Sequence, residues 1–191
     1  MPEEAKILKI SGGNTLLDPY FIFEQIELGA GAKVADLGCG AAGHFVIPAA
    51  KIVGKQGVVY AVDLLKSVLE AVKSRAKLEG VSGNIKTVWS NLEIYGATDI
   101  EAGSLDLALL ANTLFQIPKK EEVFREAVRL TKKGGKIAVV EWGLGASPIG
   151  PPPGRRLSKD VVRELARTNG LSEIKEFKAG PYHYGLIFSK N

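Results

Sequence analysis

The chain has 191 residues, of which 46% are hydrophobic and 24% charged, and its formal net charge is +4. This composition excludes intrinsic disorder, and the length fits one domain that folds without disulfides or a metal. The single cysteine, Cys39, excludes an internal disulfide and a multi-thiolate zinc site.

Apolar stretches of strand length alternate with amphipathic stretches of helical length. A helix-like run from Asp18 to Leu28, within an N-terminal helical extension of about 12–31, precedes a short buried strand at 33–37. Further helices are expected at 44–53, 64–79, 119–132 and 158–169. Further strands are expected at 57–62, 84–89, 105–110, 136–141, 171–178 and 182–188.

This alternation predicts a doubly wound α/β fold, in which helices cover both faces of a parallel sheet. The last two strands are separated by only Ala179-Gly180-Pro181, which permits only an antiparallel hairpin. A Gly/Pro-rich loop at 143–157 is neither helix nor strand. No repeat or sharp boundary divides the sequence, so we expect a single domain over residues 1–191.

The strongest motif is the segment 36–43, DLGCGAAG, between the first strand and the next helix. Gly38, Gly40 and Gly43 allow a tight turn and a close approach of backbone N–H groups to a ligand. Asp63 ends the second strand, where a carboxylate can accept hydrogen bonds from ribose hydroxyls. The pattern predicts a cofactor site. The alternative is a turn-forming glycine cluster beside an unrelated aspartate.

Both dinucleotides and S-adenosylmethionine bind to such a loop, and Asp36 distinguishes the two. A carboxylate at the mouth of the loop repels a pyrophosphate, which needs the positive end of the helix. S-adenosylmethionine has no phosphate and carries an ammonium and a sulfonium, so Asp36 favours it. The alternative reading of Asp36 is a cap at the end of a strand.

The stretch VADLGCGAAGHFVIPAAKIVGKQGVVYAVD resembles the first two motifs of class I S-adenosylmethionine-dependent methyltransferases, closest to the ubiquinone/menaquinone-biosynthesis type. The likeness continues through LDLALLANTLFQI and LTKKGGKIAVVEW and covers about residues 12–188. It implies a Rossmann-like sheet of seven strands, mostly parallel with the last strand antiparallel. The sequence departs from the family at Ala42, where a third glycine is usual, so the loop is expected to be one residue longer.

The resemblance also implies which residues bind S-adenosylmethionine. Asp36 and the glycines line its methionyl end, Asp63 holds the ribose, and Leu64 packs against the adenine. Asn91 stands where the family often has an acidic residue facing the adenine amino group, with a loop cap as the alternative. The full cofactor set is Asp36, Gly38, Cys39, Gly40, Gly43, Asp63, Leu64, Asn91, Leu92 and Ala111.

Ligands of open α/β sheets bind outside the carboxyl ends of the parallel strands. Aromatic side chains in this region would suit a flat or apolar acceptor, although such residues often only complete a core. The candidate acceptor contacts are Asn112, Phe115, Trp142 and Tyr182, with Tyr184 nearby. If the nucleophile must lose a proton, His183 is the first candidate base and Glu141 the second. Arg155 and Arg156 either meet an anionic acceptor, form a lid, or are simply solvated.

The sequence therefore predicts an S-adenosylmethionine-dependent methyltransferase that transfers a methyl group in line to a small, lipophilic or aromatic acceptor. The alternatives are an RNA or protein methyltransferase, an NAD(P)-dependent oxidoreductase, and a binding module without turnover. No metal site is expected, and a nucleic-acid partner is not favoured. Charges in the first ten residues and the lack of a long apolar run predict no secretory signal and no membrane span, hence a cytoplasmic location.

Overall fold

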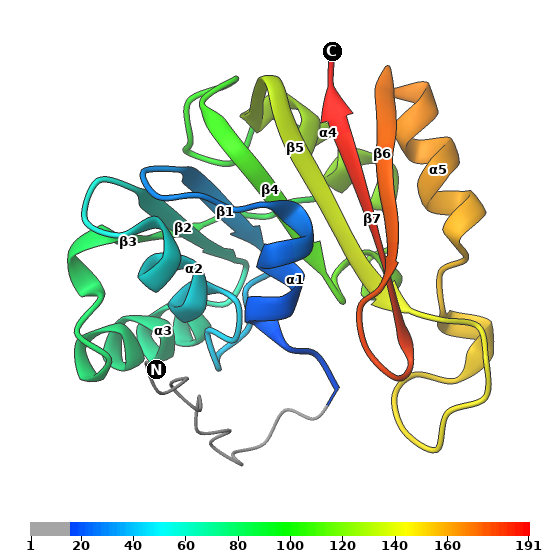
Figure 1. The fold of residues 1–191 in the computed structure, drawn as a ribbon, viewed down its shortest axis with the longest axis horizontal. Helices are drawn as coiled ribbons and strands as arrows, with labels where there is room; N and C mark the ends of the chain where they lie inside the picture. Colours follow the sequence, from blue (N-terminus) through cyan, green and yellow to red (C-terminus); the bar gives the residue numbers. More distant parts are fainter. Residues whose placement is uncertain (1–15) are drawn as a thin grey trace, which may run out of the picture.

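The computed structural model describes residues 16–191. Its core is one seven-stranded sheet in the order β3-β2-β1-β4-β5-β7-β6 (Figure 1). The first five strands run parallel, and β7 runs antiparallel to both β5 and β6. The predicted sheet with an antiparallel last strand is confirmed. The strands are β1 Lys33–Leu37, β2 Val58–Asp63, β3 Ile85–Trp89, β4 Leu105–Ala111, β5 Thr131–Trp142, β6 Leu171–Lys178 and β7 His183–Lys190.

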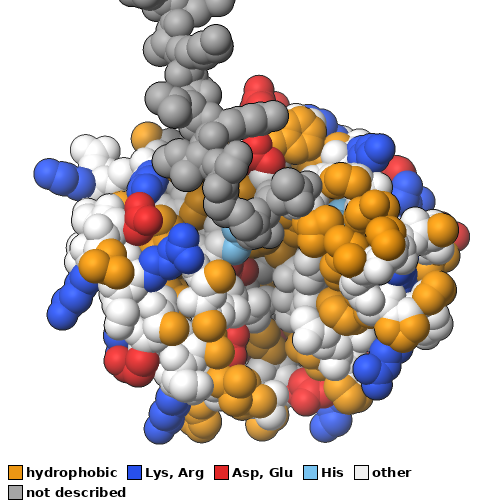
Figure 2. Space-filling view, turned by 90° about the horizontal axis from the view of Figure 1, so that it is seen from below, with side chains coloured by type: hydrophobic (Ala, Val, Ile, Leu, Met, Phe, Trp, Pro, Cys, Tyr) orange, Lys and Arg blue, Asp and Glu red, His pale blue; other side chains and the backbone are white. Residues whose placement is uncertain are grey.

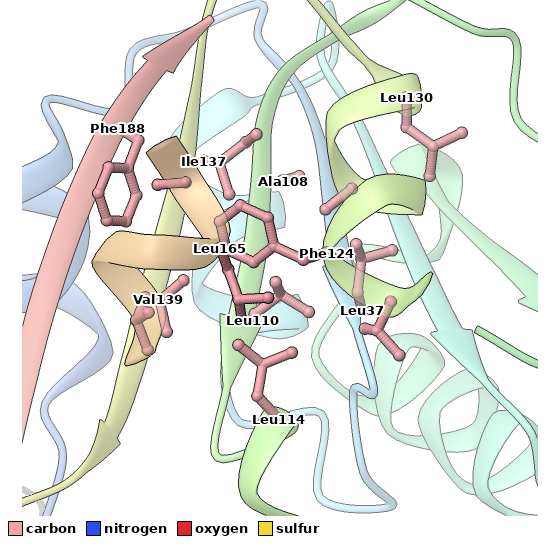
Figure 3. Close-up of a cluster of buried hydrophobic side chains, with 14 of the residues drawn as sticks. Leu37, Ala108, Leu110, Leu114, Phe124, Leu130, Ile137, Val139, Leu165 and Phe188 are labelled. Atoms are coloured by element: carbon pink, nitrogen blue, oxygen red, sulfur yellow. The ribbon is translucent and has the colours of Figure 1, made fainter. Parts of the chain in front are cut away.

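Helices cover both faces of the sheet, as the alternation predicts. One face carries α1 Pro19–Ile26, α2 Val46–Val53 and α3 Lys66–Leu78, and the other carries α4 Lys120–Leu130 and α5 Lys159–Thr168 (Figure 1). The α4/α5 side packs Phe124, Leu165 and Phe188 into the core (Figure 3). Phe124 and Phe188 meet edge to face, with ring centroids 6.3 Å apart. The packed helices hold both faces of the sheet, and the connecting loops lie at the two ends of its strands.

The N-terminal helix has a clear local origin. The Asp18 carboxylate accepts hydrogen bonds from the N–H groups of Tyr20 and Phe21, and Pro19 occupies the first helical position. The helix ends at Glu27, which takes a left-handed conformation with φ of 60°. The helical run predicted from Asp18 to Leu28 is thus confirmed as a shorter helix. Residues 12–15 of the predicted extension lie outside the described residues.

The main difference from the sequence prediction is β5, which begins at Thr131 rather than at residue 136. Gly134 and Gly135 do not separate helix from strand but lie inside β5, where its register with β4 shifts. A side chain at Gly135 would place its Cβ 2.9 Å from the Leu105 carbonyl oxygen. The two glycines therefore lie in an irregular stretch of β5, which pairs with β4 both before and after them.

The hairpin and the long loop both reach the carboxyl edge of the sheet. Trp142, the last residue of β5, pairs with His183, the first residue of β7. The β6–β7 turn is therefore beside the end of β5, as the sequence predicts. The 143–157 loop starts from the same point and contains one short 3-10 turn, Pro153–Arg155. Within residues 16–191, no helix has the length and apolar character needed to cross a membrane.

Candidate functional site

The glycine loop follows β1 and is held against the neighbouring strands. The N–H groups of Gly38 and Cys39 both donate to the Val62 carbonyl, at 2.9 and 3.0 Å. Gly38 has φ of +88°, and a Cβ there would lie 2.8 Å from the Thr113 hydroxyl oxygen. That hydroxyl in turn donates to the Leu37 carbonyl at 2.9 Å. Only glycine fits at Gly38, because the end of β4 packs directly on the loop.

A tight turn closes the glycine loop at Gly43. The Gly43 N–H donates to the Gly40 carbonyl at 3.2 Å, and the Gly43 carbonyl accepts the Ile47 N–H at 3.0 Å. Gly43 has φ of +55°, a conformation that favours glycine. The helix α2 consequently begins at Val46, two residues later than predicted. Gly43 therefore closes the loop ahead of α2.

Two carboxylates from adjacent strands lie beside this loop. Asp63 accepts the N–H of Gly40 at 3.2 Å and that of Leu65 at 3.0 Å, so it links the glycine loop to the start of α3. Asp36 is 2% exposed, and its Oδ2 atom has no hydrogen-bond partner. Burial, together with the negative charge of Asp63, raises the pKa of Asp36 to about 7. Such a pair of carboxylates favours a cationic ligand.

The residues expected near an adenine ring are partly exposed and partly in the core. Leu64 is 49% exposed and free to contact a ligand, whereas Leu92 is buried in the hydrophobic core. The Asn91 side-chain oxygen accepts the Glu93 N–H at 3.0 Å, so Asn91 forms the loop cap that was its alternative role. Trp89, which sequence reasoning treated only as a strand residue, is 57% exposed and donates from Nε1 to the Leu64 carbonyl.

The loop after β3 is fastened by an ion pair that the sequence analysis did not identify. Glu126 on α4 is fully buried and accepts the N–H groups of Gly96 and Thr98. Arg129 binds Glu126 through two nitrogens and also donates to the Thr98 carbonyl. Burial opposes ionisation of Glu126, but the hydrogen bonds from Arg129, Gly96 and Thr98 outweigh it and lower its pKa to about 2. The only sequence signal was an acid three residues before an arginine on a helix.

Unsatisfied buried polar atoms gather at one edge of the sheet. Among residues 16–191, the buried side-chain nitrogen and oxygen atoms without a partner belong to Asp36, Asn112, Glu141 and His183. These residues lie at or next to the carboxyl ends of β1, β4 and β5 and at the start of β7, which are neighbouring strands. Buried polar groups are almost always paired, so these four residues are candidates for contacts with a ligand.

The ends of β4 and β5 are coupled through Glu141. Its Oε1 atom accepts the Leu114 N–H at 2.8 Å and the Phe115 N–H at 3.4 Å, while Oε2 has no partner. Burial raises the pKa of Glu141 to about 7, although the backbone N–H groups partly offset this shift. Asn112 has φ of 53°, uncommon for a residue other than glycine, and its Oδ1 is also unpartnered. Asn112 and Glu141, both candidate site residues, therefore each have an unpartnered side-chain oxygen at the carboxyl edge of the sheet.

His183 lies against Trp142, with ring centroids 4.1 Å apart, and neither of its ring nitrogens has a partner. Burial and the nearby charge of Arg156 lower the pKa of His183 to about 4, so the ring is neutral at pH 7. Trp142 itself is only 7% exposed and contacts the loop at Gly150. Tyr184 is buried and donates to the Leu157 carbonyl at 3.0 Å. Trp142 and Tyr184 thus complete the packing of this edge.

The two arginines of the 143–157 loop have different environments. Arg156 is buried and donates to the carbonyls of Pro151, Gly143 and Gly145. The expectation that Arg156 is solvated is therefore wrong, because its guanidinium is buried and holds the backbone of the loop. Arg155 is exposed and lines a cavity.

That cavity, of about 440 Å³, lies beside the 3-10 turn Leu114–Gln116 that follows β4. Its lining residues are Phe115, Gln116, Ile117, Pro118, Lys120 and Arg155. Figure 2 looks onto the carboxyl edge and shows it hollowed between its two halves, with hydrophobic side chains gathered on one side. Phe115 and Tyr182 are half-buried at this edge. Phe115 is the predicted acceptor contact that lines the cavity.

A family model described as a methyltransferase domain matches residues 28–174. The ubiquinone/menaquinone biosynthesis C-methyltransferase of Azotobacter vinelandii is 29% identical over 140 residues, 73% of this chain and 54% of that protein. The protein of the same name from Pseudomonas putida is 30% identical over 133 residues, 70% of this chain and 50% of that protein. The chain spans about half the length of these curated relatives.

Solved structures show the same fold. A SAM dependent methyltransferase from Aquifex aeolicus superposes with a TM-score of 0.82 at 22% identity, covering 91% of this chain and 90% of that one. The [4+2]-cyclase SpnF superposes with a TM-score of 0.75 at 14% identity, covering 90% of this chain and 79% of that one. The family match, which includes the glycine loop and both acidic strand ends, agrees with this architecture. The chain belongs to the methyltransferase-domain family, and it is similar in sequence to ubiquinone/menaquinone biosynthesis C-methyltransferases.

Proposed function

We propose that this protein transfers a methyl group from S-adenosylmethionine to a small-molecule acceptor. The observation that carries the proposal is the pair Asp36 and Asp63 beside the glycine loop. The pKa of Asp36 is raised by burial and by Asp63, so a cation on the ligand would stabilise its ionised form. An ammonium and a sulfonium supply that cation, whereas a pyrophosphate would add to the repulsion.

The glycine loop also leaves open space at Gly40. A Cβ placed on Gly40 would meet no heavy atom within 4 Å, so the loop is open on that side. Asp36 and the loop from Gly38 to Gly43 would hold the methionyl end, and Asp63 the ribose. Leu64 and Ala111 would contact the adenosyl group, with Trp89 beside Leu64. Cys39, Asn91 and Leu92 would then support the loops rather than bind directly, because two are buried and Asn91 caps its own loop.

The bound cofactor supplies a methyl group on an already activated leaving group. The protein therefore has mainly to align the acceptor in line with that methyl, and alignment contributes up to roughly 7–11 kcal/mol to such reactions. A base is needed only for a nucleophile that must lose a proton. Glu141 suits that role better than His183, because its pKa of about 7 lies close to neutral pH.

The acceptor is proposed to be small, with a lipophilic or aromatic part. Support comes from the apolar side of the cavity, formed by Phe115, Ile117 and Pro118. The curated relatives act, by name, in ubiquinone and menaquinone biosynthesis, where methylation occurs on carbon. A cytoplasmic location is part of the proposal and is compatible with Cys39 as a free, buried thiol.

The test is an assay with S-adenosylmethionine labelled at its methyl group and a panel of phenols, hydroxyquinones and aromatic acids. We expect labelled product and S-adenosylhomocysteine above the level seen without acceptor for at least one compound. Binding of S-adenosylhomocysteine without turnover of any small molecule, RNA or protein would instead indicate a binding module. This control is necessary because the [4+2]-cyclase SpnF has the same fold, so the fold alone does not establish methyl transfer.

A further inference from the structure

We infer that the acceptor carries an anionic group, a carboxylate or a phosphate, which binds between Lys120 and Arg155. This inference rests on the proposed function and narrows its acceptor class. It starts from the composition of the cavity at the end of β4. One side is apolar, through Phe115, Ile117 and Pro118, and the charged residues in the lining are both cations.

Neither cation is neutralised within the described part of the chain. Lys120 is half-buried at the start of α4, and Arg155 is exposed in the 3-10 turn of the long loop. None of the ion pairs among residues 16–191 includes Lys120 or Arg155. In contrast, Arg156 next to Arg155 is saturated by backbone carbonyls. The loop therefore uses one arginine for its own fold and presents the other to the cavity.

Acidic residues occur close by but do not face the cavity. Glu122, in the first turn of α4, is paired with Arg125 at 3.0 Å. Glu93 accepts the Lys119 N–H at 3.2 Å. Glu121 is exposed and is not part of the lining. The cavity thus combines an apolar wall with positive charge, and that combination recognises an amphipathic anion.

The position of the cavity connects it to the methyl-transfer edge. Phe115 lines it, and the Phe115 N–H also points to Glu141 at the end of β5. Asn112, with its unpartnered Oδ1, is tied to the same turn because the Gln116 amide donates to its carbonyl at 2.6 Å. An acceptor anchored by its anion in the cavity would therefore extend its reactive part toward Asn112 and Glu141.

The experiment compares matched probes on the full chain. The probes are 2-naphthoate, 2-naphthyl phosphate and the neutral 2-naphthamide, titrated by naphthalene fluorescence at low ionic strength with and without S-adenosylhomocysteine. We expect the wild-type protein to bind at least one anion about tenfold more tightly than the amide, since charge-assisted hydrogen bonds are the stronger ones. Whichever of the two anions binds more tightly identifies the class. Added salt should reduce the preference.

The variant K120Q/R155Q should lose the preference and still bind S-adenosylhomocysteine. The matched control is K55Q/K133Q, which changes net charge equally at two exposed lysines away from the cavity and should retain the preference. Equal binding of anions and amide to the wild type, no binding of any probe, or a preference that survives K120Q/R155Q would each overturn the inference alone. A wild type that does not bind S-adenosylhomocysteine would overturn the proposed function and the acceptor assignment with it.

Discussion

Asp36 and Asp63 end neighbouring parallel strands, and the charge of Asp63 helps to raise the pKa of Asp36 to about 7. Asp63 is held by the N–H groups of Gly40 and Leu65, whereas one oxygen of Asp36 has no partner. Asp36 is therefore a buried carboxylate with one oxygen that no protein group satisfies, at the point where a cationic ligand is proposed to bind. Natural proteins retain such unsatisfied groups mainly where function needs them.

Replacing Asp36 by asparagine should stabilise the protein and at the same time weaken its binding of S-adenosylmethionine. An unfolded aspartate ionises near pH 3.8 and the folded Asp36 near 7, so the native state retains a proton between these values and loses stability as pH rises through that window. At pH 8 we expect D36N to raise the free energy of unfolding by about 1–3 kcal/mol, while weakening S-adenosylmethionine binding at least tenfold. Urea denaturation and calorimetry measure the two effects.

The control for this variant is pH 5, where the wild-type Asp36 is protonated and the stability difference should shrink. A D36N protein that is less stable at pH 8 and still binds S-adenosylmethionine normally would contradict the assigned role.

Gly38→Ala should disturb the loop more than Gly40→Ala. Both glycines have positive φ, so both alanines carry backbone strain of about 1 kcal/mol or more. At Gly38 the new Cβ would also meet the Thr113 side chain at 2.8 Å, while at Gly40 it meets nothing within 4 Å. We expect G38A to unfold at clearly lower urea concentration than G40A. Equal midpoints would mean that the packing of Thr113 on Gly38 does not restrict the loop.

Glu126→Gln should lower the free energy of unfolding by an amount that depends on pH. Its pKa is lowered from 4.5 to about 2, so its stabilising effect is complete above pH 4.5 and is lost as pH falls toward 2. At pH 7 we expect E126Q to lower the free energy of unfolding by up to about 3 kcal/mol, because Arg129 and two N–H groups lose a charged acceptor. Urea denaturation at pH 7 and pH 3 should show the difference narrowing at acid pH. E122Q, at an exposed pair on the same helix, is the matched control and should change little.

Arg156→Lys should loosen the 143–157 loop. A lysine cannot reach the three carbonyls of Pro151, Gly143 and Gly145 in the fork geometry of arginine. We therefore expect faster cleavage of this loop in limited proteolysis followed by mass spectrometry. R155K, which alters an exposed side chain with no such contacts, should be cleaved at the wild-type rate. Identical cleavage of the two variants would show that Arg156 does not organise the loop.

The two candidate bases predict different pH–rate profiles with an acceptor that must lose a proton. A base acts when deprotonated, so Glu141 gives a rate that rises with pH up to about 7, whereas His183 gives a rate that is level from pH 5 to 8. We expect the rise, and a loss of about 10²-fold or more in kcat for E141Q. A level profile together with a loss of activity only in His183→Ala would assign the base to His183.

The features that depend on local pattern could be predicted from the sequence. Strand–helix alternation, the short turn at residues 179–181 and the glycine loop each follow from residue type and spacing. The bulge at Gly134 and Gly135 could not, because glycines mark both a chain reversal and an irregular strand, and only pairing with β4 distinguishes them.

The roles of individual charged residues depended on tertiary contacts. Arg155 and Arg156 are adjacent and chemically identical, yet one lines a cavity and the other is buried among carbonyls. In the sequence, Glu126 is one of several acidic residues on a charged helix. In the structure it is buried, because the loop at Gly96 packs against it and donates a hydrogen bond to it. Such roles depend on where distant segments meet, which spacing along one element does not encode.

Calorimetric titration of the purified protein with S-adenosylhomocysteine and, separately, with NAD⁺ tests most directly whether the loop beside Asp36 binds a sulfonium cofactor. We expect saturable binding of S-adenosylhomocysteine with one site per chain, weakened in D36N, and no measurable binding of NAD⁺. Tight binding of NAD⁺ with no response to S-adenosylhomocysteine would contradict this expectation, because a diphosphate would then occupy the loop beside Asp36.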